Sequence, residues 1–200
     1  MEGELVFHIL FWVLIVILLG IRGYFAWRVR QTGGRLMPDQ AAVQREGKIM
    51  FASRVVLFFV LVGWLIAYAF NPVWVQALDF PLPAWLRWVG FILGLAGLAL
   101  LAWTEAVLGR HWSAQLQLRQ EHHLVTSGPY ARVRHPLYAS MVVFGVGFAL
   151  LTANWIFAAL AALIIIGLFA RIPREEQMML EQFGDEYRAY MHKTGRLFPK

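Results

Sequence analysis

Long apolar runs separated by short polar segments are the main pattern of this chain. The first run extends from Leu5 to Trp27, the second from about Val55 to Phe70 and the third from Trp88 to Leu108. A helix rises 1.5 Å per residue, so about 20 apolar residues cross a hydrocarbon core of about 30 Å. The three runs therefore predict three transmembrane helices.

A fourth apolar stretch extends from Pro136 to Ala170 and contains no charged residue. As one straight helix it would be more than about 50 Å long, which exceeds the thickness of a bilayer. The polar break Thr152-Ala153-Asn154, followed by Trp155, predicts two antiparallel helices of about 16 to 18 residues joined by a tight turn. The expected fold is all-α, with five transmembrane helices, of which the fourth and fifth form a short hairpin.

The charged tail after this stretch has the pattern of a further helix, which is amphipathic. Pro173 suits the first turn of a helix, where its missing N–H costs nothing. Apolar residues recur downstream at helical spacing, namely Met179, Phe183, Tyr187, Tyr190 and Met191.

The composition places the chain in a membrane. Apolar residues make up 60% and charged residues 15% of the sequence, which is far from the balance of soluble globular proteins. The absence of cysteine excludes a disulfide scaffold, an iron–sulfur centre, thiolate zinc and a cysteine nucleophile. His122, His123 and His135 do not have the spacing of a metal-binding pair on one helix face, so the sequence does not favour a metal site.

The net charge of +6 is explained by membrane topology. Three segments, 28–54, 110–134 and 171–200, hold 16 of the 18 basic residues. Because basic residues are retained on the cytoplasmic side, these segments are expected in the cytoplasm and the N-terminus outside. No nucleic-acid partner is expected.

Polar chemistry concentrates at two cytoplasmic positions. Arg171 directly follows the apolar run and needs a partner, which Glu175 provides one turn on. The pair is either structural or a cationic clamp for an anionic substrate, and its spacing leaves both interpretations open. The segment Arg134-His135-Pro136-Leu137-Tyr138, preceded by Gly128-Pro129-Tyr130, gathers donors and aromatics at a helix N-terminus, where an anion is favoured.

In its C-terminal half the chain resembles the isoprenylcysteine carboxyl methyltransferase family. The resemblance is to its small archaeal and bacterial five-helix members, which are related to the phospholipid methyltransferases. The residues that carry the resemblance stand in the family's order: Leu108-Gly109-Arg110-His111-Trp112-Ser113, the stretch His122 to Tyr138, Glu175-Glu176, Phe183-Gly184-Asp185-Glu186-Tyr187 and Gly195-Arg196-Leu197-Phe198-Pro199.

The resemblance implies one membrane methyltransferase domain over residues 1–200, with three helices in 1–108 and the cofactor loop, the hairpin and the C-terminal helix in 109–200. It implies S-adenosylmethionine as the methyl donor and a lipid-tailed acceptor from the bilayer, namely the carboxylate of an isoprenylcysteine-like substrate. Arg171 and Glu175 match the catalytic pair. The residues that match the cofactor site are His122, Leu124, Val125, Gly128, Tyr130, Arg134, His135, Tyr138 and Glu175.

Several alternatives remain open. An amine or thiol acceptor would need a base, for which His135 and Glu175 are the first candidates. Sterol reductases, which use NADPH, resemble the same C-terminal region, and a non-catalytic membrane scaffold is a third reading. The oligomeric state is also open, because the small residues at 94–97 and 145–147 suit packing within one bundle as well as dimerisation.

Overall fold

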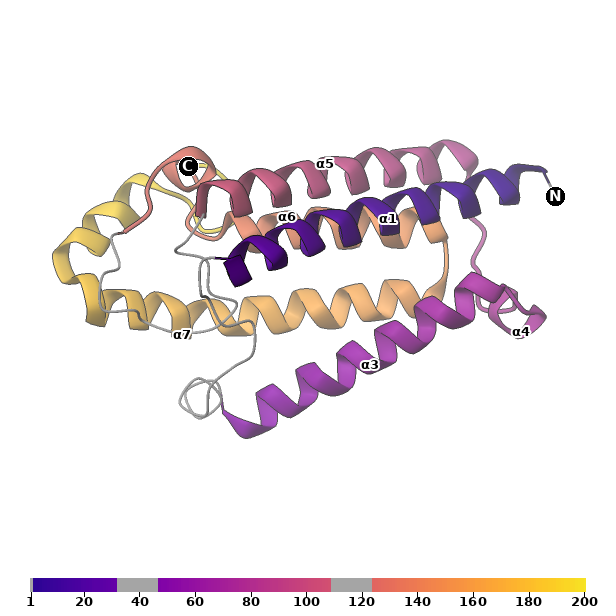
Figure 1. The fold of residues 1–200 in the computed structure, drawn as a ribbon, viewed down its shortest axis with the longest axis horizontal. Helices are drawn as coiled ribbons and strands as arrows, with labels where there is room; N and C mark the ends of the chain where they lie inside the picture. Colours follow the sequence, from indigo (N-terminus) through magenta and orange to yellow (C-terminus); the bar gives the residue numbers. More distant parts are fainter. Residues whose placement is uncertain (1, 32–46, 109–123) are drawn as a thin grey trace.

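The structure is a computed structural model, and it describes residues 2–31, 47–108 and 124–200. These ranges are helical throughout, apart from short connections. The elements are α1 (Glu2–Gln31), α3 (Lys48–Phe70), α4 (Val73–Gln76), α5 (Ala84–Leu108), the 3₁₀ turn η2 (Gly128–Ala131), α6 (Pro136–Thr152) and α7 (Trp155–Lys193). In Figure 1, α1, α5 and α6 lie side by side, α7 returns along α6, and α3 lies obliquely beneath them.

All five predicted apolar segments are helical. Four helices, α1, α3, α5 and α7, are long and apolar enough to cross a membrane, whereas α6 is a shorter apolar helix of 17 residues. Large apolar side chains such as Leu19, Ile66 and Ile166 are exposed on the outside of the bundle, as expected for surfaces that face lipid. The chain is therefore a multi-pass integral membrane protein.

The predicted turn between the fourth and fifth helices is present. Ala153 adopts the left-handed conformation with φ 49° and ends α6. Asn154 then caps α7, because its side-chain oxygen accepts a hydrogen bond from the N–H of Ile156 at 3.1 Å. Its amide nitrogen also donates to Asp79 Oδ1 at 2.7 Å, which ties the turn to the connection before α5.

The sequence predicts that the C-terminal helix begins at Pro173, and the structure shows that it does not. Helix α7 runs on through Pro173 and changes direction only at Gly184, whose φ of 53° suits a residue without a side chain. Proline removes one helical hydrogen bond, and the neighbouring Ile172 is buried in a cluster with Tyr138 and Leu197, which holds this part of α7 in place. One continuous helix therefore leaves the apolar region carrying both Arg171 and Glu175.

Glycines bring α5 and α6 into close contact. A Cβ atom at Gly147 would lie 2.4 Å from the backbone nitrogen of Gly94 and 2.6 Å from the carbonyl oxygen of Gly90. A Cβ at Gly97 would lie 2.6 Å from the backbone nitrogen of Phe144. Such contacts are typical of small residues between membrane helices. These glycines therefore serve packing within the bundle.

Candidate active site

Residues 194–200, which we call the C-terminal segment, form backbone hydrogen bonds with the residues at the start of α6. The N–H of Arg134 donates to the carbonyl of Gly195 at 2.8 Å, and the N–H of His135 donates to the carbonyl of Arg196 at 3.0 Å. In return, the N–H of Gly195 donates to the carbonyl of Arg132 at 3.1 Å. The last part of α7 turns back to make this contact (Figure 1). Two of the backbone donors expected to face an anion are thus used by the chain itself.

Arg134 joins α7 and the C-terminal segment from the inside. Its Nε donates to Glu176 Oε1 at 2.8 Å, and its Nη1 donates to the carbonyls of Met191 at 3.1 Å and Thr194 at 2.5 Å. The other oxygen of Glu176 lies 3.0 Å from Arg196 Nη2. Because Glu176 is buried between two guanidinium groups, this cluster holds the site together.

Arg171 and Glu175 form the pair that their spacing predicts, and a tyrosine joins them. Arg171 Nε donates to Glu175 Oε1 at 2.7 Å, and the Tyr138 hydroxyl donates to the same oxygen at 2.5 Å. Both charged side chains are largely shielded from solvent, with exposed fractions of 14% for Arg171 and 18% for Glu175. The carboxylate therefore positions the guanidinium where α7 changes from apolar to charged residues.

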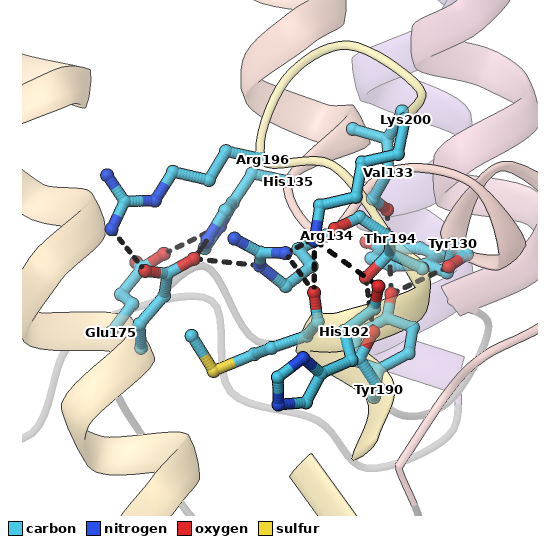
Figure 2. A network of polar contacts seen from close by, with 12 residues as sticks. Tyr130, Val133, Arg134, His135, Glu175, Tyr190, His192, Thr194, Arg196 and Lys200 are labelled. Atoms are coloured by element: carbon cyan, nitrogen blue, oxygen red, sulfur yellow. Dashed lines mark hydrogen bonds and ion pairs between the residues drawn. The ribbon is translucent and has the colours of Figure 1, made fainter. Parts of the chain in front are cut away.

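His135 lies between the two carboxylates of α7. Its Nδ1 is 3.6 Å from Glu175 Oε2 and its Nε2 is 3.6 Å from Glu176 Oε1. Figure 2 shows His135 pointing toward Glu175. Its ring stacks on Tyr138 with 5.5 Å between the centroids. Burial lowers the pKa of His135 below its usual value, although both carboxylates oppose the shift, so the ring is neutral at pH 7. Among the described residues, buried Nε2 has no hydrogen-bond partner.

Tyr130 belongs to the same cluster. The Tyr190 hydroxyl on α7 donates to the carbonyl of Tyr130 at 2.6 Å. Burial raises the pKa of the Tyr130 phenol, and the charges of Tyr190, Glu175 and Glu105 add to this shift. The phenol is therefore neutral, and it lies close enough to Glu175 for the charge of that carboxylate to act on it.

The structure thus brings together most of the predicted site residues: Tyr130, Arg134, His135, Tyr138, Arg171 and Glu175. Gly128 begins η2 with φ 59°, where a Cβ would lie 2.7 Å from Val107 on α5. Leu124 and Val125 are half-buried at the start of the same described segment. His122 lies outside the described residues.

The residues that hold this cluster in place were not predicted from the sequence. Glu176 and Arg196 stand inside the quoted motifs and Thr194 directly precedes the last of them, but no role was assigned to these residues. The pair Glu175-Glu176 was the available signal: two adjacent carboxylates on a helix point about 100° apart, so one of them had to find partners on another element. Arg134 and Arg196 are those partners.

The arrangement is suited to binding a polar, charged ligand beside an apolar surface. It offers a guanidinium, a carboxylate, a neutral imidazole and two phenols at one end of the bundle. Within the described ranges no group of histidine, aspartate and glutamate side chains is placed to hold a metal ion.

Comparisons with known proteins point to one family. The sequence model of the isoprenylcysteine carboxyl methyltransferase (ICMT) family matches residues 88–181. The chain is 33% identical to the nickel-cobalt-cadmium resistance protein NccN of Alcaligenes xylosoxydans xylosoxydans over 56% of this chain and 53% of that protein. It is 31% identical to protein-S-isoprenylcysteine O-methyltransferase B of Arabidopsis thaliana over 55% of this chain and 57% of that protein.

A solved structure shares the fold. The eukaryotic intramembrane Ras methyltransferase ICMT superimposes with a TM-score of 0.52 and 26% identity, covering 76% of this chain and 51% of that chain. The chain therefore spans about half the length of the proteins it matches.

Proposed function

We propose that this chain, which belongs to the isoprenylcysteine carboxyl methyltransferase family, is a membrane methyltransferase that transfers a methyl group from S-adenosylmethionine to a lipid-tailed acceptor. The acceptor group is the carboxylate of an isoprenylcysteine-like molecule. The observation that carries this proposal is the Arg171–Glu175–Tyr138 unit beside neutral His135, at the point where α7 leaves the apolar region.

The residues present fit the methyl donor. His135 Nε2 is buried without a hydrogen-bond partner among the described residues, so a polar ligand supplies what the protein does not. The carboxylate of Glu175 attracts the positive charges of the donor, and Tyr130 and Tyr138 offer aromatic surfaces. We assign to the donor site the residues from the family motif: His122, Leu124, Val125, Gly128, Tyr130, Arg134, His135, Tyr138 and Glu175.

When bound, S-adenosylmethionine supplies a methyl group on a sulfonium, which an acceptor carboxylate takes by direct displacement without a proton transfer. The protein's task is therefore alignment and exclusion of water. Arg171 orients the acceptor carboxylate. Glu175 shares the charge of that guanidinium, which prevents it from binding the carboxylate so tightly that attack is opposed.

The surroundings of Arg171 suit an acceptor that arrives from the membrane. Directly after Arg171 in the chain, Ile172 lines a cavity of about 290 Å³ together with Phe169, Leu197, Phe198 and the charged Arg196. The apolar lining and the Arg196 guanidinium together match a lipid tail that ends in an anionic group. For an amine or thiol acceptor, neutral His135 or Glu175 would have to accept the proton.

The distribution of basic residues supports an orientation in which this end of the bundle faces the cytoplasm. The segments 28–54, 110–134 and 171–200, which hold most of the basic residues, are then cytoplasmic, and the N-terminus lies outside.

Binding and turnover test the proposal separately. The melting temperature of the detergent-purified protein is titrated with S-adenosylmethionine, S-adenosylhomocysteine and NADPH at matched ionic strength. We expect stabilisation by the two adenosyl ligands and none by NADPH. Stabilisation by NADPH alone would instead identify a reductase, and no response from the folded protein would favour a scaffold.

Turnover is measured as transfer of labelled methyl groups to an S-farnesylated cysteine analogue with a free carboxyl group. The matched control is the same analogue as its methyl ester. Transfer to the acid alone identifies the carboxylate as the acceptor group. Equal transfer to both would exclude the carboxylate and leave an amine or thiol.

A further inference from the structure

Two ion pairs join α1 to α5, and they have the same separation along the chain. Glu4 on α1 pairs with Arg87 on α5, and Arg22 on α1 pairs with Glu105 on α5, each across 83 residues. The two helices are therefore parallel and in register. We call the end of the bundle that contains residues 152–154 the hairpin end, and the end that contains residues 134–138 the site end.

The pair at the hairpin end is complete. Arg87 is buried, and its Nε donates to the carbonyl of Leu151 at 2.9 Å while its Nη1 donates to Glu4 at 2.7 Å. Its guanidinium carbon lies 4.0 Å from the centroid of the Phe7 ring. Glu4 is 72% exposed, so water reaches its carboxylate.

The pair at the site end is incomplete. Glu105 is only 1% exposed, and Arg22 bonds one of its oxygens, Oε1. Among the residues that the structure describes, the other oxygen, Oε2, is buried without a hydrogen-bond partner, and so is Oγ1 of the adjacent Thr104, which is 0% exposed. A carboxylate oxygen buried without a donor is costly, and native structures rarely keep one without a function.

Glu105 lies near the candidate active site. The turn η2 packs on α5 near this residue, as the close approach of Gly128 to Val107 shows. Beyond the effect of burial, the charges of Glu175 and Glu105 both act on the Tyr130 phenol, so both carboxylates lie near this residue.

We propose that Glu105 Oε2 and Thr104 Oγ1 form a polar subsite that binds a hydroxyl or ammonium group of the ligand held at the candidate active site. Both Oε2 of Glu105 and Oγ1 of Thr104 can accept a hydrogen bond, so a ligand with N–H or O–H groups fits this pair of atoms. Arg22 donates to Oε1, which leaves Oε2 for the ligand. This inference rests on the proposed function, because the methyl donor is the ligand whose hydroxyl and ammonium groups fit it.

The test compares three variants of the full chain. Glu105→Gln removes the charge while keeping the size, and Thr104→Val removes the hydroxyl without changing the Arg22–Glu105 pair. The matched control is Glu4→Gln, which breaks the α1–α5 pair at the hairpin end. For each, the dissociation constant of S-adenosylhomocysteine, the KM for the farnesylated analogue and the ligand-free melting temperature are measured.

We expect Glu105→Gln to weaken binding of S-adenosylhomocysteine about tenfold and Thr104→Val about threefold. Glu4→Gln is expected to leave binding within about twofold and to lower only the melting temperature. If the bound group belongs to the acceptor, the KM for the analogue rises by similar factors while binding of S-adenosylhomocysteine stays unchanged.

A purely structural pair gives a different result. Glu105→Gln and Thr104→Val would then leave both the dissociation constant of S-adenosylhomocysteine and the KM for the analogue unchanged. Glu105→Gln would lower only the melting temperature, as the control does. This outcome overturns the inference. If Glu105→Gln does not fold, Thr104→Val decides alone, and unchanged affinities for both ligands overturn the inference. Failure of the wild-type protein to bind S-adenosylhomocysteine would overturn the proposed function itself.

Discussion

At the hairpin end of the bundle, Asn154 bonds Asp79 and the N–H of Ile156, and Arg87 bonds Leu151 and Glu4. At the site end, three buried side-chain atoms of the described residues have no hydrogen-bond partner: Thr104 Oγ1, Glu105 Oε2 and His135 Nε2. Both ends contain buried polar groups. Among the described residues, those at the hairpin end have hydrogen-bond partners within the protein, whereas three atoms at the site end do not. The hairpin end is therefore built for stability, whereas the site end leaves polar atoms available to a ligand.

The largest expected effect lies at the site end, in turnover. Arg171→Ala removes the guanidinium that orients the acceptor carboxylate, so we expect methyl transfer to fall at least about 100-fold. The dissociation constant of S-adenosylhomocysteine should stay within a few-fold, as measured by calorimetry. If that binding were lost as well, Arg171 would belong to the donor site and not to the acceptor site.

At the hairpin end, Asn154→Ala should lower stability without changing ligand binding. The substitution removes a helix cap and the hydrogen bond to Asp79, so we expect a loss of about 2 kcal/mol in the free energy of unfolding. Denaturant unfolding in detergent measures this loss. The difference between the two ends would disappear if the same variant also weakened binding of S-adenosylhomocysteine.

His135→Ala should produce the opposite pattern. Because its Nε2 is proposed to contact the methyl donor, binding of S-adenosylhomocysteine should weaken about fivefold. His135→Asn, which keeps a polar side chain, should recover part of the affinity. Unchanged affinity in the alanine variant would remove His135 from the donor site.

The smallest expected effect is a pH dependence of stability. Burial lowers the pKa of His135 from 6.5, so the unfolded chain binds a proton at a higher pH than the folded protein does. Stability should therefore be constant above about pH 7 and fall as the pH drops below 6.5. Melting temperatures of the wild type and His135→Asn between pH 7.5 and 5.5 measure this; equal slopes would assign the loss to other groups.

Local patterns in the sequence predicted much of the fold and part of the site. The lengths of the apolar runs predicted the helices, and the break at residues 152–154 predicted the hairpin turn, because chain length and helix capping are properties of neighbouring residues. The Arg171–Glu175 pair was predicted for the same reason, since four residues bring two side chains to one face of a helix.

Pro173 shows where local patterns mislead. Proline at the end of an apolar run favours the start of a new helix, yet α7 continues because Ile172 packs against Tyr138 and Leu197, which come from distant parts of the chain. The energy of that packing outweighs one lost hydrogen bond.

The sequence by itself determined that this is a helical membrane protein with a charged cluster beside its fourth and fifth apolar segments, because hydrophobic length and short-range spacing are written in consecutive residues. Only the tertiary structure decided that Glu176 lies between Arg134 and Arg196, and that Glu105 meets Arg22 with one oxygen left over. These contacts join residues 20 to more than 80 positions apart. They exist because the packing of the bundle brings α1 against α5 and α7 against α6, and consecutive residues do not specify which distant segments become neighbours.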